Sequence, residues 1–173
     1  LYLESTGQKA VHEDDLAEKK RMLVDKSEEH RGILRTILDN PDIRDRFILK
    51  LTYNSNRIEG STLTEPDTAA VLFDNIALPN RSLTEQLEAK NHQTAINFLF
   101  DSVIRDESLD EAFILKLHGI LMNGIRSDAG VYRNHGVRIL GVNLPTANFL
   151  KIKELVPDIL LEARQQTNDC VAL

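Results

Sequence analysis

The stretch at residues 39–60, DNPDIRDRFILKLTYNSNRIEG, contains the start, the apolar face and the end of one helix. Asn40 can accept hydrogen bonds from the first free N–H groups, and Pro41 has the backbone angle of the first helical position. Gly60 can adopt the left-handed conformation that ends a helix, so the sequence predicts a helix that stops there. Between these signals, apolar side chains recur at helical spacing at Ile43, Phe47, Leu51 and Ile58.

The end of this predicted helix carries a hydroxyl and a carboxylate one turn apart. Ser55 and Glu59 are four positions apart, so their side chains share one face of the helix, and Gly60 follows directly. Two interpretations fit this pattern. Glu59 is either an ordinary solvated residue at a glycine-capped helix end or a carboxylate presented for a function.

Helical patterns continue on both sides of this stretch. Residues 14–38 are rich in charge with sparse apolar positions, which predicts a solvated peripheral helix. Three later helices are predicted by a Ser or Thr three residues before an acid, in the pairs Thr64 with Asp67, Ser82 with Glu85 and Ser108 with Glu111. Apolar residues on the last two of these helices are expected to meet in a core: Leu87, Leu99 and Val103, and Phe113, Ile114, Leu117 and Leu121. The predicted fold class is therefore all-α, a helix bundle.

The helical pattern is interrupted after Gly130. Turn residues at 134–136 and 141–145 flank a short extended run at 137–140, which predicts one short β-hairpin. A last helical stretch, KIKELVPDILLEARQQ at 151–166, is expected to be kinked or split at Pro157. We divide the chain into a peripheral helix at 1–39, a main helical part at 40–162 and a tail at 163–173.

Composition disfavours several classes of protein. The 173 residues are 42% hydrophobic and 28% charged, which is typical of one globular domain. A net charge of -6 disfavours nucleic acid as a partner. No apolar run reaches the roughly 18 residues of a membrane span, and the N-terminus has no basic region followed by a hydrophobic one. We therefore expect a cytoplasmic protein with no membrane partner.

Histidines and glycines give little evidence of catalysis. The five histidines form no close pair and no metal-binding motif, so no metal site is expected. His118 lies among apolar residues of a predicted core helix and is interpreted as a hydrogen-bonded structural histidine. The string NGIR at 123–126 indicates a helix end at Gly124 more simply than a phosphate-binding loop.

The order of several motifs resembles the Fic family of nucleotide-dependent protein-modifying enzymes over residues 40–162. SNRIEG at 55–60 is similar to the inhibitory motif of that family, which is Ser or Thr, three residues, Glu, then Gly or Asn. LHGILMNGIRSDAGVYR at 117–133 is similar to its helix and Gly-x-Tyr-Arg turn, and VRILGVNLP at 137–145 to its flap hairpin. The resemblance implies a Fic-like helix bundle with a single flap hairpin.

The resemblance also implies roles for individual residues. Glu59 would pair with an arginine of the catalytic loop and occupy the space of the ATP γ-phosphate, with Ser55 and Gly60 completing this regulatory motif. The flap would bind the backbone of a target protein as an added strand, through Val137, Arg138, Ile139, Leu140, Gly141 and Pro145. The family reaction transfers AMP from ATP to a target hydroxyl and uses Mg²⁺, so ATP and Mg²⁺ are the implied cofactors. A homo-oligomer is a possible assembly.

The catalytic loop of the family is not found in this sequence. That loop is His-Pro-Phe, an acid, then Gly-Asn-Gly-Arg, and the chain contains no His-Pro pair. No histidine here therefore inherits the role of general base, and no residue inherits the metal or phosphate role. The resemblance therefore implies the regulatory and target-docking part of a protein adenylyltransferase, which we expect to be inactive as this chain alone. The alternative is a non-catalytic helical interaction module, such as one that blocks a Fic active site in trans.

Overall fold

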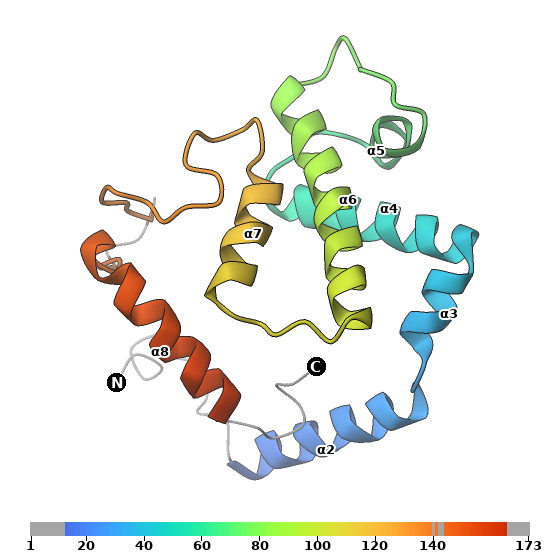
Figure 1. Cartoon of the computed structure of the whole chain (residues 1–173). Coiled ribbons are helices and arrows are strands. Elements are labelled where there is room, and N and C mark those ends of the chain that lie inside the picture. The colour runs from blue at the N-terminus through green and yellow to red at the C-terminus, as the bar shows by residue number, and fades with distance from the viewer. Residues whose placement is uncertain (1–12, 140, 142–143, 166–173) are drawn as a thin grey trace. The chain divides into compact units, whose positions relative to one another are not determined.

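The computed structural model describes the backbone at residues 13–139, 141 and 144–165, and all the elements within these ranges are helical (Figure 1). This confirms the all-α prediction for the described residues. The helices are α2 (Glu13–Glu29), α3 (Ile33–Asp39), α4 (Pro41–Ile58), α5 (Glu65–Phe73), α6 (Leu83–Ile104), α7 (Glu111–Leu121), the short 3₁₀ helix η1 (Phe149–Lys151) and α8 (Ile152–Gln165). None of the described helices combines the length and hydropathy that a membrane span requires.

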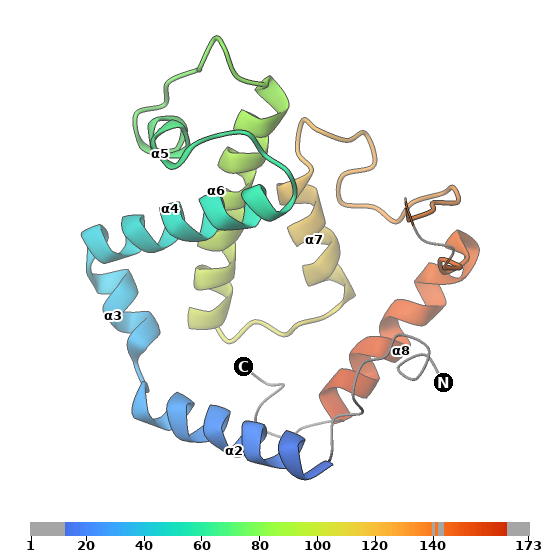
Figure 2. The ribbon, with the colours of Figure 1, turned by 180° about the vertical axis from the view of Figure 1, so that it is seen from behind.

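The chain divides into two units. The larger unit is Leu34–Leu161 and contains α4 to α7. Within it, α6 packs against α4, α5 and α7, and the two opposite views show α4 crossing α6 while α7 runs beside it (Figures 1 and 2). The buried apolar cluster comes from α4, α5, α6 and the α4–α5 connection: Ile48, Leu63, Val71, Leu72, Ala89, Ile96 and Phe100. Helix α6 is thus the element on which the others are assembled.

The second unit contains α2, with the described residues 13–33 and 162–165. An ion pair between Arg31 and Glu28 joins exposed side chains at 3.2 Å just after α2. The single helix expected at 14–38 is wrong, because α2 ends at Glu29 and α3 begins at Ile33. Gly32 lies between them with φ +88°, a backbone conformation that a helix cannot contain.

The start and the end of α4 form as the sequence predicts. The Asn40 side chain accepts a hydrogen bond from the Ile43 N–H at 3.2 Å, and Pro41 is the first helical residue. At the other end Gly60 has φ +97°. The Gly60 N–H donates to the Arg57 carbonyl at 3.1 Å and the Ser61 N–H to the Asn56 carbonyl at 2.9 Å, the two bonds of a Schellman motif.

Of the three predicted capping boxes, one forms completely. Thr64 and Asp67 exchange both bonds at the start of α5. Ser82 accepts from the Glu85 N–H at 3.4 Å, but the Glu85 carboxylate bonds elsewhere. The third box is wrong: Asp110, not Ser108, is the N-cap of α7 and accepts from the Phe113 N–H at 2.8 Å. Both residue types suit an N-cap, and the local sequence signal does not choose between two such residues that lie two positions apart.

The predicted core face of α6 is partly wrong. Leu99 is 37% exposed and Val103 63% exposed, whereas Ala89, Ile96 and Phe100 are buried. The two sets lie on neighbouring stripes of the same helix, and periodicity alone does not choose between adjacent apolar stripes. The α7 positions expected in the core, Phe113, Ile114, Leu117 and Leu121, are only half-buried.

The predicted hairpin is not seen in the described residues. Residues 137–139, 141 and 144–148 have no strand, and Leu140, Val142 and Asn143 lie outside the described residues. The segment instead carries side-chain to backbone hydrogen bonds, which a two-stranded ladder would not need. Helix α8 begins after η1 and continues through Pro157 without a break.

Candidate functional site

Ser55, Glu59 and Gly60 lie together at the end of α4. Glu59 is the C-cap residue, and its N–H donates to the Ser55 carbonyl at 3.3 Å. The Glu59 side chain is exposed and Ser55 is half-buried. The structure shows no hydrogen bond between the Ser55 hydroxyl and the Glu59 carboxylate, so the backbone, not the Ser55 side chain, fixes the position of Glu59.

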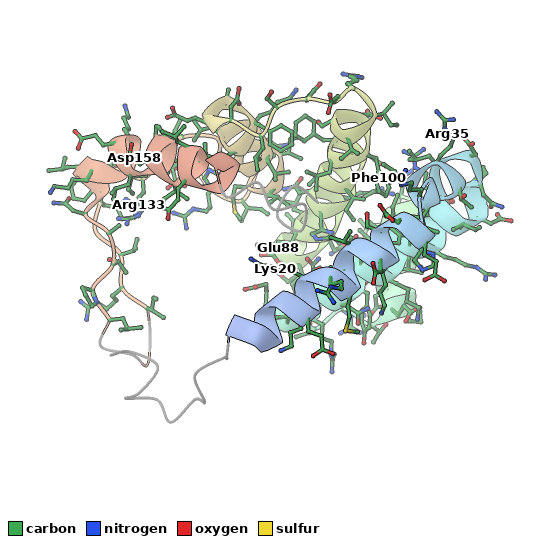
Figure 3. All side chains as sticks on the ribbon, turned by 90° about the horizontal axis from the view of Figure 1, so that it is seen from below. Lys20, Arg35, Glu88, Phe100, Arg133 and Asp158 are labelled. Atoms are coloured by element: carbon green, nitrogen blue, oxygen red, sulfur yellow. The ribbon has the colours of Figure 1, made fainter. Side chains whose placement is uncertain are left out.

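Two further carboxylates from the start of α6 lie close to Glu59, and we call Glu59, Glu85 and Glu88 the acidic patch. The Thr62 N–H and hydroxyl donate to the Glu85 carboxylate at 2.7 and 3.0 Å. Burial raises the pKa of Glu88, and the charges of Glu85 and Glu59 raise it further. Glu88 is labelled on α6 in Figure 3. Among the described residues Glu59 forms no ion pair.

A buried polar contact joins α4 to α6 two turns before Glu59. The Thr52 hydroxyl lies 3.0 Å from His92 Nδ1, and Thr52 is fully buried. Burial lowers the pKa of His92, so the neutral imidazole is favoured there. This contact helps to set the register between α4 and α6, and Glu59 and the other members of the acidic patch are carried by these two helices.

The predicted target-binding residues lie in an irregular segment between α7 and η1. Val137, Arg138, Ile139, Gly141 and Pro145 are exposed, and Leu140 lies outside the described residues. Two hydrogen bonds bring the ends of this segment together. Arg133 Nη2 donates to the Ala147 carbonyl at 2.7 Å, and the Thr146 hydroxyl donates to the Val137 carbonyl at 2.7 Å. Arg133 is labelled in Figure 3.

Sequence reasoning missed a polar cluster directly after α7. Arg126 and Asp128 form a two-bond ion pair at 2.8 and 2.9 Å, and this guanidinium lowers the pKa of the Asp128 carboxyl to about 2. A cavity of about 430 Å³ separates this pair from α7 and the start of α8, with His118, Tyr132 and Arg133 among its lining residues. The Arg-x-Asp spacing in IRSDAG is the only signal that could have indicated the pair.

His118 is a hydrogen-bonded histidine, as predicted. The Gly130 N–H donates to its Nδ1 at 3.2 Å. The hydroxyl of Tyr132 in the same cluster is buried and has no hydrogen-bond partner among the described residues. Its pKa is raised by burial and by the neighbouring Glu111 carboxylate. The cluster is therefore a polar junction between α7 and the segment that follows it.

The described residues do not supply a magnesium site. They contain no group of three histidine, cysteine or acidic side chains arranged to hold a metal ion. The acidic patch alone, with Glu85 already bonded to Thr62, does not fit such an ion. We therefore name no described residue as a ligand of Mg²⁺.

Comparison with known proteins adds no relative to this description: no family model matches the sequence, and no curated protein does. The geometry that bears on function is thus the acidic patch at the end of α4, the irregular segment after α7 and the polar junction between that segment and α7.

Proposed function

We propose that this chain is the regulatory and target-docking part of a Fic-type protein adenylyltransferase. One observation carries the proposal: Glu59 is exposed at a helix end fixed by a Schellman motif, and it forms no ion pair within the described residues. A carboxylate held in this way is available to a cation from another polypeptide segment. The resemblance of SNRIEG to the inhibitory motif supplies the identity of that cation, an arginine of the catalytic loop.

The inhibition follows from charge. A carboxylate in the space of a γ-phosphate repels the incoming anion and neutralises the arginine that would bind it. Glu85 and Glu88 strengthen the repulsion because they add negative charge next to Glu59. The segment from Val137 to Pro145 would then bind the target protein as an extended peptide, since its described residues are exposed.

The experiment uses a form of the protein whose reading frame includes the His-Pro-Phe loop. Glu59→Gly should increase AMP transfer from labelled ATP by about tenfold or more, because two unit charges 4 Å apart interact by about 4 kcal/mol near a protein surface. Asp74→Gly is the matched control, since Asp74 is also an exposed C-cap residue, at the end of α5. Ser55→Ala should have little effect, because no hydrogen bond joins its hydroxyl to Glu59.

Equal activity of Glu59→Gly and the wild-type protein would refute the inhibitory role. The chain of 173 residues alone should give only background labelling, because it contains no His-Pro-Phe loop. Labelling that depends on this chain and survives its purification would contradict that expectation.

A second function is favoured by the apolar side chains around Glu59. Ile58 is 83% exposed and directly precedes Glu59, and Leu83 at the start of α6 is 71% exposed. Large apolar side chains exposed to this degree are available for contact with another protein. The chain would then act as an interaction module that blocks a Fic active site in trans.

Adding the 173-residue chain to a Fic enzyme that lacks its own inhibitory helix distinguishes the two functions. Inhibition that increases with concentration and is lost in Ile58→Ser supports a module acting in trans. Absence of inhibition at any concentration, with activation by Glu59→Gly in the longer protein, supports regulation within one chain.

A further inference from the structure

The contact between His118 and Gly130 requires one protonation state of the imidazole. The Gly130 backbone N–H can only donate, so Nδ1 of His118 must carry a free lone pair to accept at 3.2 Å. A proton on Nδ1 would place two N–H donors face to face at this distance. The hydrogen bond is therefore made by neutral His118 and lost when the ring becomes a cation.

The backbones at this contact have little freedom to accommodate such a change. Gly119 and Gly130 pack so closely that a Cβ on Gly130 would lie 3.3 Å from the Gly119 Cα and 3.4 Å from the Leu115 carbonyl oxygen. The loop backbone at Gly130 thus lies directly against α7. A repulsive pair of donors there moves the loop away from the helix, because the helix is held by its own hydrogen bonds.

Several charged and titratable groups lie around His118. Among the residues that line the adjoining cavity, the ionisable ones besides His118 are Arg126, Asp128, Tyr132 and Arg133, and α8 contributes only Ile152. Asp128 is ionised throughout the neutral range, since its pKa is about 2, and it interacts electrostatically with His118.

Arg126 is already paired with Asp128, and Glu111 at the start of α7 acts on Tyr132. His118 also lies in the last turn of α7, where a cation is stabilised by the helix dipole.

The His118–Gly130 contact joins α7 to the irregular segment that follows it. The described residues 126–139, 141 and 144–148 contain no helix or strand. The backbone at Gly130 is joined to α7 by the His118 bond, and the Arg126 N–H donates to the carbonyl of Met122, the C-cap residue of α7, at 3.1 Å. Further along the segment, Arg133 donates to the Ala147 carbonyl and the Thr146 hydroxyl to the Val137 carbonyl, so residues near its two ends are joined to each other.

We propose that His118 and Gly130 form a pH-sensitive latch that holds the backbone around Gly130 against α7 when His118 is neutral and releases it when His118 gains a proton. Histidine is the side chain that changes charge between pH 5 and 8, so the latch operates across the range found in cells. The inference does not depend on AMP transfer, since it concerns only the docking of this segment in the chain itself.

Nuclear magnetic resonance of the ¹⁵N-labelled chain tests the latch. Hydrogen exchange of the Gly130 amide, corrected for the pH dependence of the intrinsic rate, should become roughly fivefold faster between pH 8 and pH 5, as expected for the loss of one hydrogen bond. The ring nitrogen shifts of His118 should show a proton on Nε2 and none on Nδ1 at pH 8.

Two variants separate this latch from other titrations. His118→Asn places an oxygen acceptor at the position of Nδ1 without a titrating ring, so the corrected exchange of Gly130 should be independent of pH. His135→Asn removes a histidine from the same segment that does not bond to Gly130, and it should leave the wild-type pH dependence intact.

Three results would overturn the latch: a proton on Nδ1 at pH 8, corrected exchange at Gly130 that does not change with pH in the wild-type chain, or an unchanged pH dependence in His118→Asn. The first two are measured on the wild-type chain and remain decisive if the Asn variant does not fold.

Discussion

Replacing Gly130 by alanine should destabilise the chain more than the same replacement at Gly124, although both glycines have a similar backbone conformation. The φ angles are +78° at Gly130 and +71° at Gly124, so alanine pays a comparable strain of about 1–2 kcal/mol at either site. The surroundings differ. A Cβ at Gly124 would meet only the Leu87 Cδ1 at 3.8 Å, an ordinary contact.

At Gly130 the obstacle is backbone, because the nearest atoms are the Gly119 Cα at 3.3 Å and the Leu115 carbonyl oxygen at 3.4 Å. Neither can rotate away as the end of a side chain can, and overpacking of this kind typically costs about 1–3 kcal/mol. Gly130→Ala should therefore reduce the free energy of unfolding by about 2–5 kcal/mol in total, or about 1–3 kcal/mol more than Gly124→Ala.

Urea unfolding of the wild-type chain and both variants, followed by circular dichroism, measures this difference. With an m value of about 1–3 kcal/mol per molar urea, the midpoints of the two variants should be separated by roughly 1 M. Equal midpoints at equal m values would show that the loop and α7 are not packed closely at Gly119 and Gly130. That result would contradict the close approach of the Gly119 and Gly130 backbones, on which the latch partly depends. Hydrogen exchange of the Gly130 amide would still test the bond to His118.

Three further predictions concern the larger unit. Burial lowers the pKa of His92 below its usual 6.5, so the unfolded chain binds a proton on this ring more readily than the folded chain. The stability of the fold should therefore be intact above pH 6.5 and fall as the pH drops below it. In His92→Gln, the urea midpoints at pH 7.5 and 5.5 should differ less than in the wild-type chain. Asn91→Ala removes a buried amide that donates to two carbonyl groups at the end of α7, at 3.0 and 2.8 Å, and should lower the free energy of unfolding by about 1–3 kcal/mol, which thermal unfolding would detect. Thr64→Ala removes the N-cap of α5 and should cost about 1 kcal/mol by urea unfolding, and an unchanged midpoint would mean that the capping box contributes nothing.

Local signals were enough to predict where α4 begins and ends. Asn40, Pro41 and Gly60 act on the backbone within one turn, so their effect does not depend on the rest of the chain. The capping signal at Ser108 gave the wrong start for α7, because Asp110, two residues later, can also accept the hydrogen bond of an N-cap. Local signals also failed for the hairpin, because a lone pair of short strands is marginally stable and side-chain hydrogen bonds from Arg133 and Thr146 hold the segment in another form.

The surroundings of Glu59 could not be predicted in this way, because they depend on how α4 crosses α6. The sequence indicated one carboxylate at a helix end, but Glu85 and Glu88 reach it only through the packing of two helices whose register the Thr52–His92 contact helps to set. Burial raises the pKa of Glu88, and the charges of Glu85 and Glu59 raise it further, so the three carboxylates repel one another. A partner that lowers this repulsion must bring positive charge, so whichever segment or protein binds at Glu59 is expected to do so through an arginine or lysine, and with an affinity that decreases as the salt concentration rises.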